Sequence, residues 1–190
     1  MEKNRLEAFS DGVIAIILTI MVLDLKVPKE HTLGSLALAW PIFGAYALSY
    51  WNVFLIWLNH HNIFSSLETI DGRILVANGL LLFVVSFIPF ATSFASETHW
   101  LETFPVVLYG LLMALVSLAF VNLRHAASQG SNTPSKAAHH LAEMRVSQVL
   151  ALTFVAGAIA AWSAPRWALI LYALVPLVRR LHQRIAPTAS

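Results

Sequence analysis

Six apolar stretches, separated by polar connections, determine what this 190-residue chain can fold into. A helix that crosses a bilayer needs roughly 17 to 25 mostly apolar residues. The stretches that meet this requirement are residues 6–25, 33–58, 74–94, 101–123, 146–162 and 164–178. Because backbone polar groups in hydrocarbon must be bonded within the protein, such stretches form helices. We therefore expect an all-α integral membrane protein, a single six-helix transmembrane bundle over residues 1–190.

The composition agrees with this expectation and excludes several functions. Hydrophobic residues make up 58% of the chain and charged residues 12%, against roughly a quarter charged in ordinary globular proteins. The net charge of +2 is too small for a nucleic-acid-binding surface. The chain has no cysteine, which excludes disulfides, thiolate nucleophiles and cysteine metal ligands.

The distribution of Lys and Arg predicts the orientation in the membrane. If the N-terminus lies in the cytoplasm, nine of these residues fall in inner segments, namely Lys3, Arg5, Arg73, Arg124, Lys136, Arg145, Arg179, Arg180 and Arg184. Three fall in outer segments, namely Lys26, Lys29 and Arg166. We therefore expect both termini in the cytoplasm, and the first stretch to be a retained helix rather than a signal peptide.

Local signals predict some helix boundaries. Thr133 before Pro134 has the usual order of a helix cap and a first helical residue. Pro89 is expected to bend the third span. Residues 124–145 are expected to form a long polar connection with a flexible loop at 128–132.

The first span is unusual because it carries an acid near each end, Asp11 and Asp24. Ionisable groups in a spanning helix are costly and by default mark function, although both acids could instead sit at the two membrane interfaces. At about 100° per residue, one stripe of this helix contains Phe9, Gly12, Ile16, Thr19, Ile20 and Leu23. Asp11 lies about 140° away from Ile16 on the same wheel. Geometry alone leaves two interpretations open: a pore lining, or ordinary helix packing around one small residue.

The motif Arg5-x-x-x-Phe9-Ser10-Asp11-Gly12 resembles the first-helix signature of the transmembrane protein 175 family, the endo-lysosomal potassium channels and their shorter prokaryotic relatives. The resemblance continues in three further groups of residues: Ile16 with Thr19–Leu23, Trp57 with His60, His61 and Phe64, and Asp71 with Asn78 and Ser86–Thr92. It covers residues 5 to 95, whereas the rest of the chain is similar in hydropathy alone.

The resemblance implies a function. Prokaryotic members are homotetramers with six helices per subunit, without a Thr-Val-Gly-Tyr-Gly filter, and this sequence also lacks that filter. A member in a bacterial plasma membrane would conduct potassium, with other monovalent cations as further candidates, passively through a central pore lined by its first helix. By position, Ile16 matches the narrowest ring, with Thr19, Ile20 and Leu23 further outward. Arg5, Ser10 and Asp11 match a polar network that a histidine joins, either His60 or His61.

Other functions are weighed on the residues themselves. The adjacent pairs His60–His61 and His139–His140 invite a haem or metal interpretation, but neighbours on a helix point about 100° apart and do not easily chelate one ion. We expect neither cofactor nor metal, and no set of side chains suggests an enzyme. The stronger rival is a proton-coupled secondary transporter that uses Asp11 and a nearby histidine. A purely structural membrane protein is a third possibility and predicts no flux.

Overall fold

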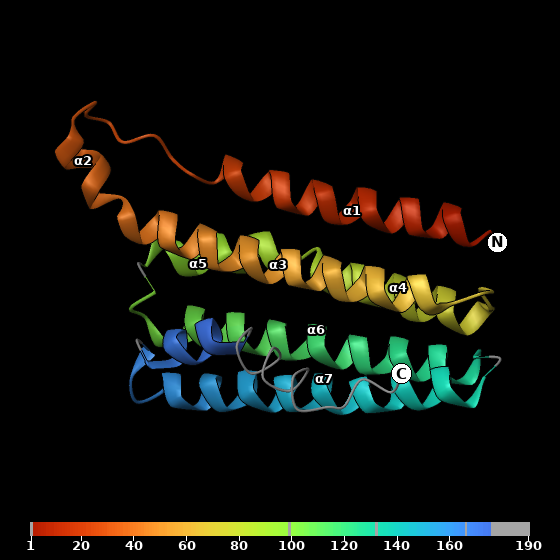
Figure 1. Cartoon of the computed structure of the whole chain (residues 1–190). Coiled ribbons are helices and arrows are strands. Elements are labelled where there is room, and N and C mark those ends of the chain that lie inside the picture. The colour runs from red at the N-terminus through yellow and green to blue at the C-terminus, as the bar shows by residue number, and fades with distance from the viewer. Residues whose placement is uncertain (1, 99, 132, 166, 176–190) are drawn as a thin grey trace.

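The computed structural model describes residues 2–98, 100–131, 133–165 and 167–175, and over these residues it is all-helical (Figure 1). The helices are α1 (Lys3–Leu23), α2 (Leu33–Leu38), α3 (Trp40–Ser66), α4 (Gly72–Val85), α5 (Ile88–Glu97), α6 (Thr103–Gln129) and α7 (Pro134–Ala161). Residues 167–175 form a further helical segment.

Five helices in the described part of the chain are long and apolar enough to cross a membrane: α1, α3, α4 together with α5, α6 and α7. At 1.5 Å per residue, the 21 residues of α1 extend about 31 Å, close to the hydrocarbon thickness of a bilayer. The expected sixth span, 164–178, includes the helical segment 167–175, while residues 166 and 176–178 lie outside the described residues.

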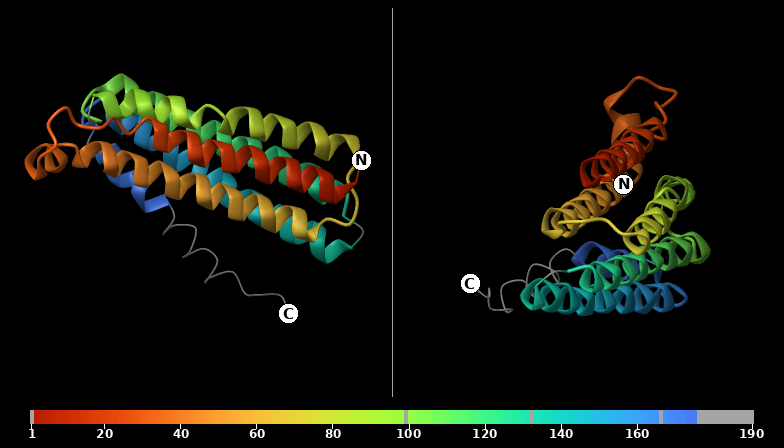
Figure 2. Two further views of the ribbon diagram at one scale, coloured as in Figure 1. Left: turned by 90° about the horizontal axis from the view of Figure 1, so that it is seen from above. Right: turned by 90° about the vertical axis from the view of Figure 1, so that its right-hand side faces the viewer.

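The helices form an elongated bundle with α1 at one edge (Figure 1). α1 packs on α3 and on the span made of α4 and α5. On the far side, α6 and α7 form an antiparallel pair, which α4 and α5 contact through α6. The end-on view of Figure 2 shows α1 and α3 together above this pair, with α4 joining the two groups along one side.

The second apolar stretch differs from the single helix expected at 33–58. It begins with α2, whose N-terminus is capped by Thr32 and Ser35, and continues as α3 after Ala39. Pro41 lies in the first turn of α3, where its missing N–H costs nothing, but it could not continue α2. α3 then extends past Leu58 to Ser66, because Asn59 and His60 are buried and bonded inside the protein.

The third span is interrupted next to Pro89, where the sequence predicted a bend. α4 ends at Val85 and α5 begins at Ile88, with Pro89 in its first turn. At the start of α4, Asp71 Oδ1 accepts a hydrogen bond from the Ile74 N–H at 2.9 Å. This bond, followed by the neighbouring Arg73, lowers the pKa of the Asp71 carboxyl. The cap is therefore ionised at neutral pH and loses its contribution only as the pH falls through that lowered pKa.

The long polar connection expected at 124–145 is instead mostly helix. α6 runs to Gln129 and α7 starts at Pro134, capped by Thr133 as predicted. The last turns of α6 and the first turns of α7 are polar and extend beyond the apolar stretches. They are stable because the two helices pair with each other, and Arg124 Nη2 lies 3.3 Å from Glu143 Oε2. The connection between the two helices is therefore residues 130–133, shorter than expected.

Tyr172 anchors the segment 167–175 to α6 and α7. Its ring is fully buried beside Tyr109 and Phe154, and its hydroxyl donates to the Val106 carbonyl at 3.2 Å. The ring occupies space left by two glycines: a Cβ at Gly110 would overlap the Tyr172 hydroxyl, and one at Gly157 would overlap Tyr172 Cε1.

We predict that Gly157→Ala destabilises the protein by about 1–3 kcal/mol, because the added methyl must displace a buried aromatic ring. The measurement is thermal unfolding of the purified protein in detergent. Gly79→Ala on α4 is the matched control, since a Cβ there meets nothing within 4 Å and alanine favours the helix. Equal unfolding temperatures for the two variants would contradict the tight packing of Tyr172.

Candidate functional site

The two faces of α1 differ in what they contact. The stripe selected from the sequence is exposed: Ile16 is 57% exposed and Leu23 78%, and Phe9, Gly12, Thr19 and Ile20 lie on the same open face. The opposite face is buried against the bundle through Leu6, Ser10, Ile14, Ile17 and Met21. Ile16 and Ile17 are therefore neighbours in sequence with opposite environments, since Ile17 is 4% exposed.

Thr19 is the polar member of the exposed stripe. Its hydroxyl donates to the Ile16 carbonyl one turn earlier, at 2.9 Å. With its proton used in this way, the Thr19 oxygen keeps lone pairs directed away from the helix. The exposed face of α1 thus presents aliphatic surface together with a hydroxyl oxygen that can accept hydrogen bonds.

The buried face of α1 is tied to the bundle by a three-residue polar chain. Asn78 of α4 donates from Nδ2 to Ser10 Oγ at 2.9 Å, and its Oδ1 lies 2.8 Å from His60 Nε2 of α3. A carbonyl oxygen can only accept, so His60 Nε2 carries the proton. All three side chains are buried. The chain therefore joins α1, α4 and α3 at one depth.

Asp11 is half-buried and accepts a hydrogen bond from Trp57 Nε1 of α3 at 2.9 Å. One turn away, Glu7 of α1 lies 3.4 Å from His61 Nδ1, and the His61 ring stacks on Trp57. Asp11 thus points away from the exposed stripe and into the contact between α1 and α3. The two histidines separate in this arrangement: His60 joins Ser10 through Asn78, and His61 pairs with Glu7.

Arg5 is exposed, and within the described residues no hydrogen bond or ion pair joins it to Asp11. Five residues were expected to form one network. The structure places four of them in two separate groups at α1, Ser10 with His60 and Asp11 with His61, and Arg5 lies at the surface. Sequence reasoning gave no role to Trp57, Asn78 or Glu7, which complete these groups. Trp57 and Asn78 belong to the motifs that carry the family resemblance, but the sequence does not show which residues they contact.

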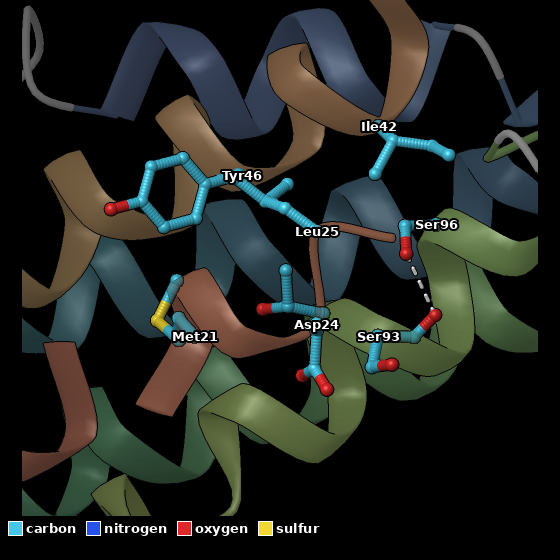
Figure 3. A pocket seen from close by; sticks show the side chains of 8 residues that line it. Met21, Asp24, Leu25, Ile42, Tyr46, Ser93 and Ser96 are labelled. Carbon is cyan, nitrogen blue, oxygen red and sulfur yellow. Dashed lines mark hydrogen bonds between the residues drawn. The ribbon is translucent and has the colours of Figure 1, made fainter. Parts of the chain in front are cut away.

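The other polar residues of the bundle do not form a comparable site. Within the described residues, no three His, Asp or Glu side chains gather in a way that could hold a metal ion. His140, a candidate haem ligand, lies 3.2 Å from Ser66 Oγ through its Nε2. At the opposite end, Asp24 lines a cavity of about 10 Å³ with Tyr46 and Ser96 (Figure 3). That space is about the size of one water molecule and admits no larger ligand.

We predict that Asn78→Leu destabilises the protein by roughly 1–2 kcal/mol, because it keeps the branched shape of the side chain but leaves the buried His60 N–H without an acceptor. The readout is the unfolding temperature in detergent. Ser86→Ala in the same span serves as control, since it removes only a local bond from an exposed hydroxyl to the Phe83 carbonyl. If both variants unfold with the parent, the chain from Ser10 to His60 does not hold α1.

Comparison with known proteins identifies relatives along most of the chain. The family model for the endosomal/lysosomal potassium channel TMEM175 matches residues 5–89. A protein named as a potassium channel in Chryseobacterium sp. (strain P1-3) is 38% identical over 181 residues, which cover 94% of this chain and 92% of the relative. The human endosomal/lysosomal proton channel TMEM175 is 38% identical over 103 residues, but this match covers 48% of this chain and 20% of the human protein.

A solved structure resembles the whole fold. The crystal structure of a lysosomal potassium-selective channel TMEM175 homolog from Chamaesiphon minutus superposes with a TM-score of 0.82 at 25% identity. The match covers 95% of this chain and 98% of that one. The family model includes α1 and the polar groups that fix its orientation, and the bacterial relative extends the similarity through α7. This chain therefore belongs to the TMEM175 family of membrane channel proteins.

Proposed function

We propose that this protein is a potassium-permeable cation channel, in which a homotetramer encloses a central pore lined by α1 of each subunit. The observation that carries the proposal is the orientation of α1. Its polar side chains are bonded into the bundle, and the stripe around Ile16 is left open at one edge of the subunit. The bacterial relatives named as potassium channels support potassium as the permeating ion.

Several copies are needed because one subunit contributes one such helix. A single helix cannot enclose a pore, whereas a closed ring of identical subunits can, with the same face of each helix toward the axis. The family resemblance favours four copies. A ring built this way also turns the exposed aliphatic residues of α1 toward the axis and away from lipid.

Ile16 would form the narrowest ring, with Thr19, Ile20 and Leu23 on the outer side of it. A ring of aliphatic side chains can block ions by expelling water from the constriction. The Thr19 oxygen, with its proton bound to the Ile16 carbonyl, would offer acceptors to a partly dehydrated cation. Passive conduction through such a pore needs no catalytic group and no cofactor.

The ends of the bundle support the proposed orientation, with the N-terminus in the cytoplasm of a bacterial plasma membrane. α1, α4 and α7 begin at the same end of the bundle (Figure 1), and their first turns carry Lys3, Arg5, Arg73 and Lys136. The other end carries large exposed aromatic side chains: Trp40, Phe104, Trp162 and Trp167. Trp is enriched at the membrane–water interface, and the basic end faces the cytoplasm.

A proton-coupled transporter, or a pore that also passes protons, is the alternative, because vertebrate relatives are named as proton channels. In that case Asp11 would have to gain and lose a proton. The described contact instead makes Asp11 the acceptor for Trp57 Nε1, a role that asparagine can also fill.

The decisive experiment is the purified protein in a planar bilayer with asymmetric potassium and sodium. We expect currents whose reversal potential follows the potassium gradient and does not move when the pH differs across the membrane. Asp11→Asn should retain current because its amide oxygen still accepts from Trp57. Flux that requires a proton gradient and disappears in Asp11→Asn would favour the transporter, and the absence of any flux would refute both.

A second prediction separates pore lining from packing. Ile16→Asn should increase the current or reduce the selectivity for potassium, with the tetramer intact, because an amide ring wets the constriction. Ile17→Asn is the matched control: it buries an amide without assured partners, costs about 1–3 kcal/mol, and should lower folded yield without changing conduction. Indistinguishable phenotypes for the two variants would show that Ile16 does not line the pore. Yield, tetramer mass and bilayer currents are the measurements.

A further inference from the structure

A groove of about 380 Å³ lies between α4 and α6, away from α1. Two buried alanines line it, Ala77 of α4 and Ala126 of α6, and Val76 forms an apolar wall. Small side chains at a helix–helix contact leave such a hollow, because larger ones would fill the space between the two backbones. Arg73, His125 and Gln129 line the end nearest the helix termini, and Asn122 adds one further polar side chain a turn inward on α6.

The groove lies at the depth where a membrane meets water. α4 starts at Gly72 and α6 ends at Gln129, so both helices reach the end of the bundle at which α1 begins (Figure 1). The α3–α4 connection belongs to this same end, since Lys3 Nζ donates to the Leu67 carbonyl at 2.8 Å. A ligand in this groove would thus have its polar part at the bundle end and its apolar part toward the membrane centre.

The surface next to the groove is apolar along the length of both helices. On α4 and α5 the exposed large side chains recur every three or four residues: Val76, Leu80, Phe83, Phe87 and Phe90. On α6 the corresponding exposed side chains are Leu111, Leu115 and Leu118. This spacing places each set on one face of its helix. The groove therefore opens onto a surface suited to hydrocarbon chains.

The polar end of the groove has unused hydrogen-bond donors on a cation. Arg73 donates from Nε to Asp71 Oδ2 at 3.0 Å and from Nη1 to Gln129 Oε1, and its Nη2 lies 2.9 Å from the same Asp71 oxygen. A guanidinium has five N–H groups in a fixed plane, so at least two remain for another acceptor. A phosphate oxygen can accept from these N–H groups and complements their charge. Gln129 in turn lies 2.9 Å from His125 Nε2, which extends the polar rim across the groove.

We propose that this groove binds one membrane phospholipid, with its phosphate on Arg73 and one acyl chain over Val76 along α4 and α6. The site is distinct from the proposed pore on α1. Because Asp71 already neutralises one charge beside Arg73, the groove recognises the phosphate and not the net charge of the headgroup. Phosphatidylglycerol and phosphatidylethanolamine should therefore bind with similar affinity.

Native mass spectrometry of the delipidated protein, titrated separately with these two phospholipids, tests the proposal. We expect tight binding of one lipid per subunit to the parent. Arg73→Gln should weaken it about tenfold, the loss expected for a hydrogen bond to a charged group. Lys136→Gln is the matched control: Lys136 lies at the same end and pairs with Glu68 at 2.6 Å, much as Arg73 pairs with Asp71, but it does not line the groove.

A second pair of variants tests the apolar part. Val76→Trp places a large ring in the groove and should also displace the lipid. Leu75→Trp is the matched control: it adds the same ring about 100° round α4 from Val76, at an exposed position outside both the groove and the apolar stripe, and should leave binding near that of the parent. Both positions are exposed, so neither change should prevent folding.

Three results would overturn the proposal. The first is a parent protein that retains no phospholipid at a defined stoichiometry. The second is equal lipid affinity for Arg73→Gln and Lys136→Gln, which would mean nonspecific annular lipid. The third is a loss of subunit association in Arg73→Gln or Val76→Trp without any change in lipid binding, which would make this face a contact between copies of the chain.

Discussion

The rest of the structure depends on the requirement that polar side chains inside a bilayer find partners within the protein. On α1 this requirement decides which way the helix faces. Ser10 and Asp11 carry the polar groups of its middle turns, and both are satisfied on the bundle side, by Asn78 and Trp57. Rotating α1 would break both bonds at once. The aliphatic stripe is therefore exposed because the polar residues hold the other face, and not through any attraction of its own.

This logic reverses the usual interpretation of an amphipathic helix. In a water-soluble protein the apolar face of a helix packs inward, and the polar face is left to contact water or to line a channel. In a bilayer an apolar face has a similar free energy against lipid and against protein, so it says little about how the helix is oriented. α3 illustrates the point, because it holds buried polar residues toward two different neighbours. Asn59 accepts from Arg124 of α6, whereas the adjacent His60 donates to Asn78 of α4. The helix thus connects the α1 side of the bundle to the α6–α7 pair through side chains.

The sequence predicted those features that depend on a single helix. The two faces of α1 follow from 100° per residue, and the break before Ile88 and the start of α7 follow from Pro89 and from Thr133 with Pro134. Features that depend on two helices were not predictable. Hydropathy gives only the length of an apolar segment. The predicted ends of the second and fourth spans, Leu58 and Leu123, are therefore too early. The helices continue because Asn59 and Arg124 satisfy each other across the bundle, and that pairing requires a register that no single segment contains.

The same limit explains why the histidine in the α1 network was left open between His60 and His61. His60 and His61 are adjacent residues at the end of the motif. A helical-wheel diagram of their helix alone does not show which of them contacts α1. In the structure both histidines contact α1 groups: α4 brings Asn78 between Ser10 and His60, and His61 pairs directly with Glu7.

A continuous helix also constrains how the proposed pore could discriminate between ions. Because the backbone carbonyls of α1 are used within the helix, they cannot replace an ion's water as a ring of free carbonyls does. Side chains alone remain, and on the exposed stripe Thr19 is the one that carries an oxygen. In the proposed pore, discrimination would therefore depend mainly on the cost of dehydrating an ion at the Ile16 ring, and that cost is lower for a larger, more weakly hydrated cation.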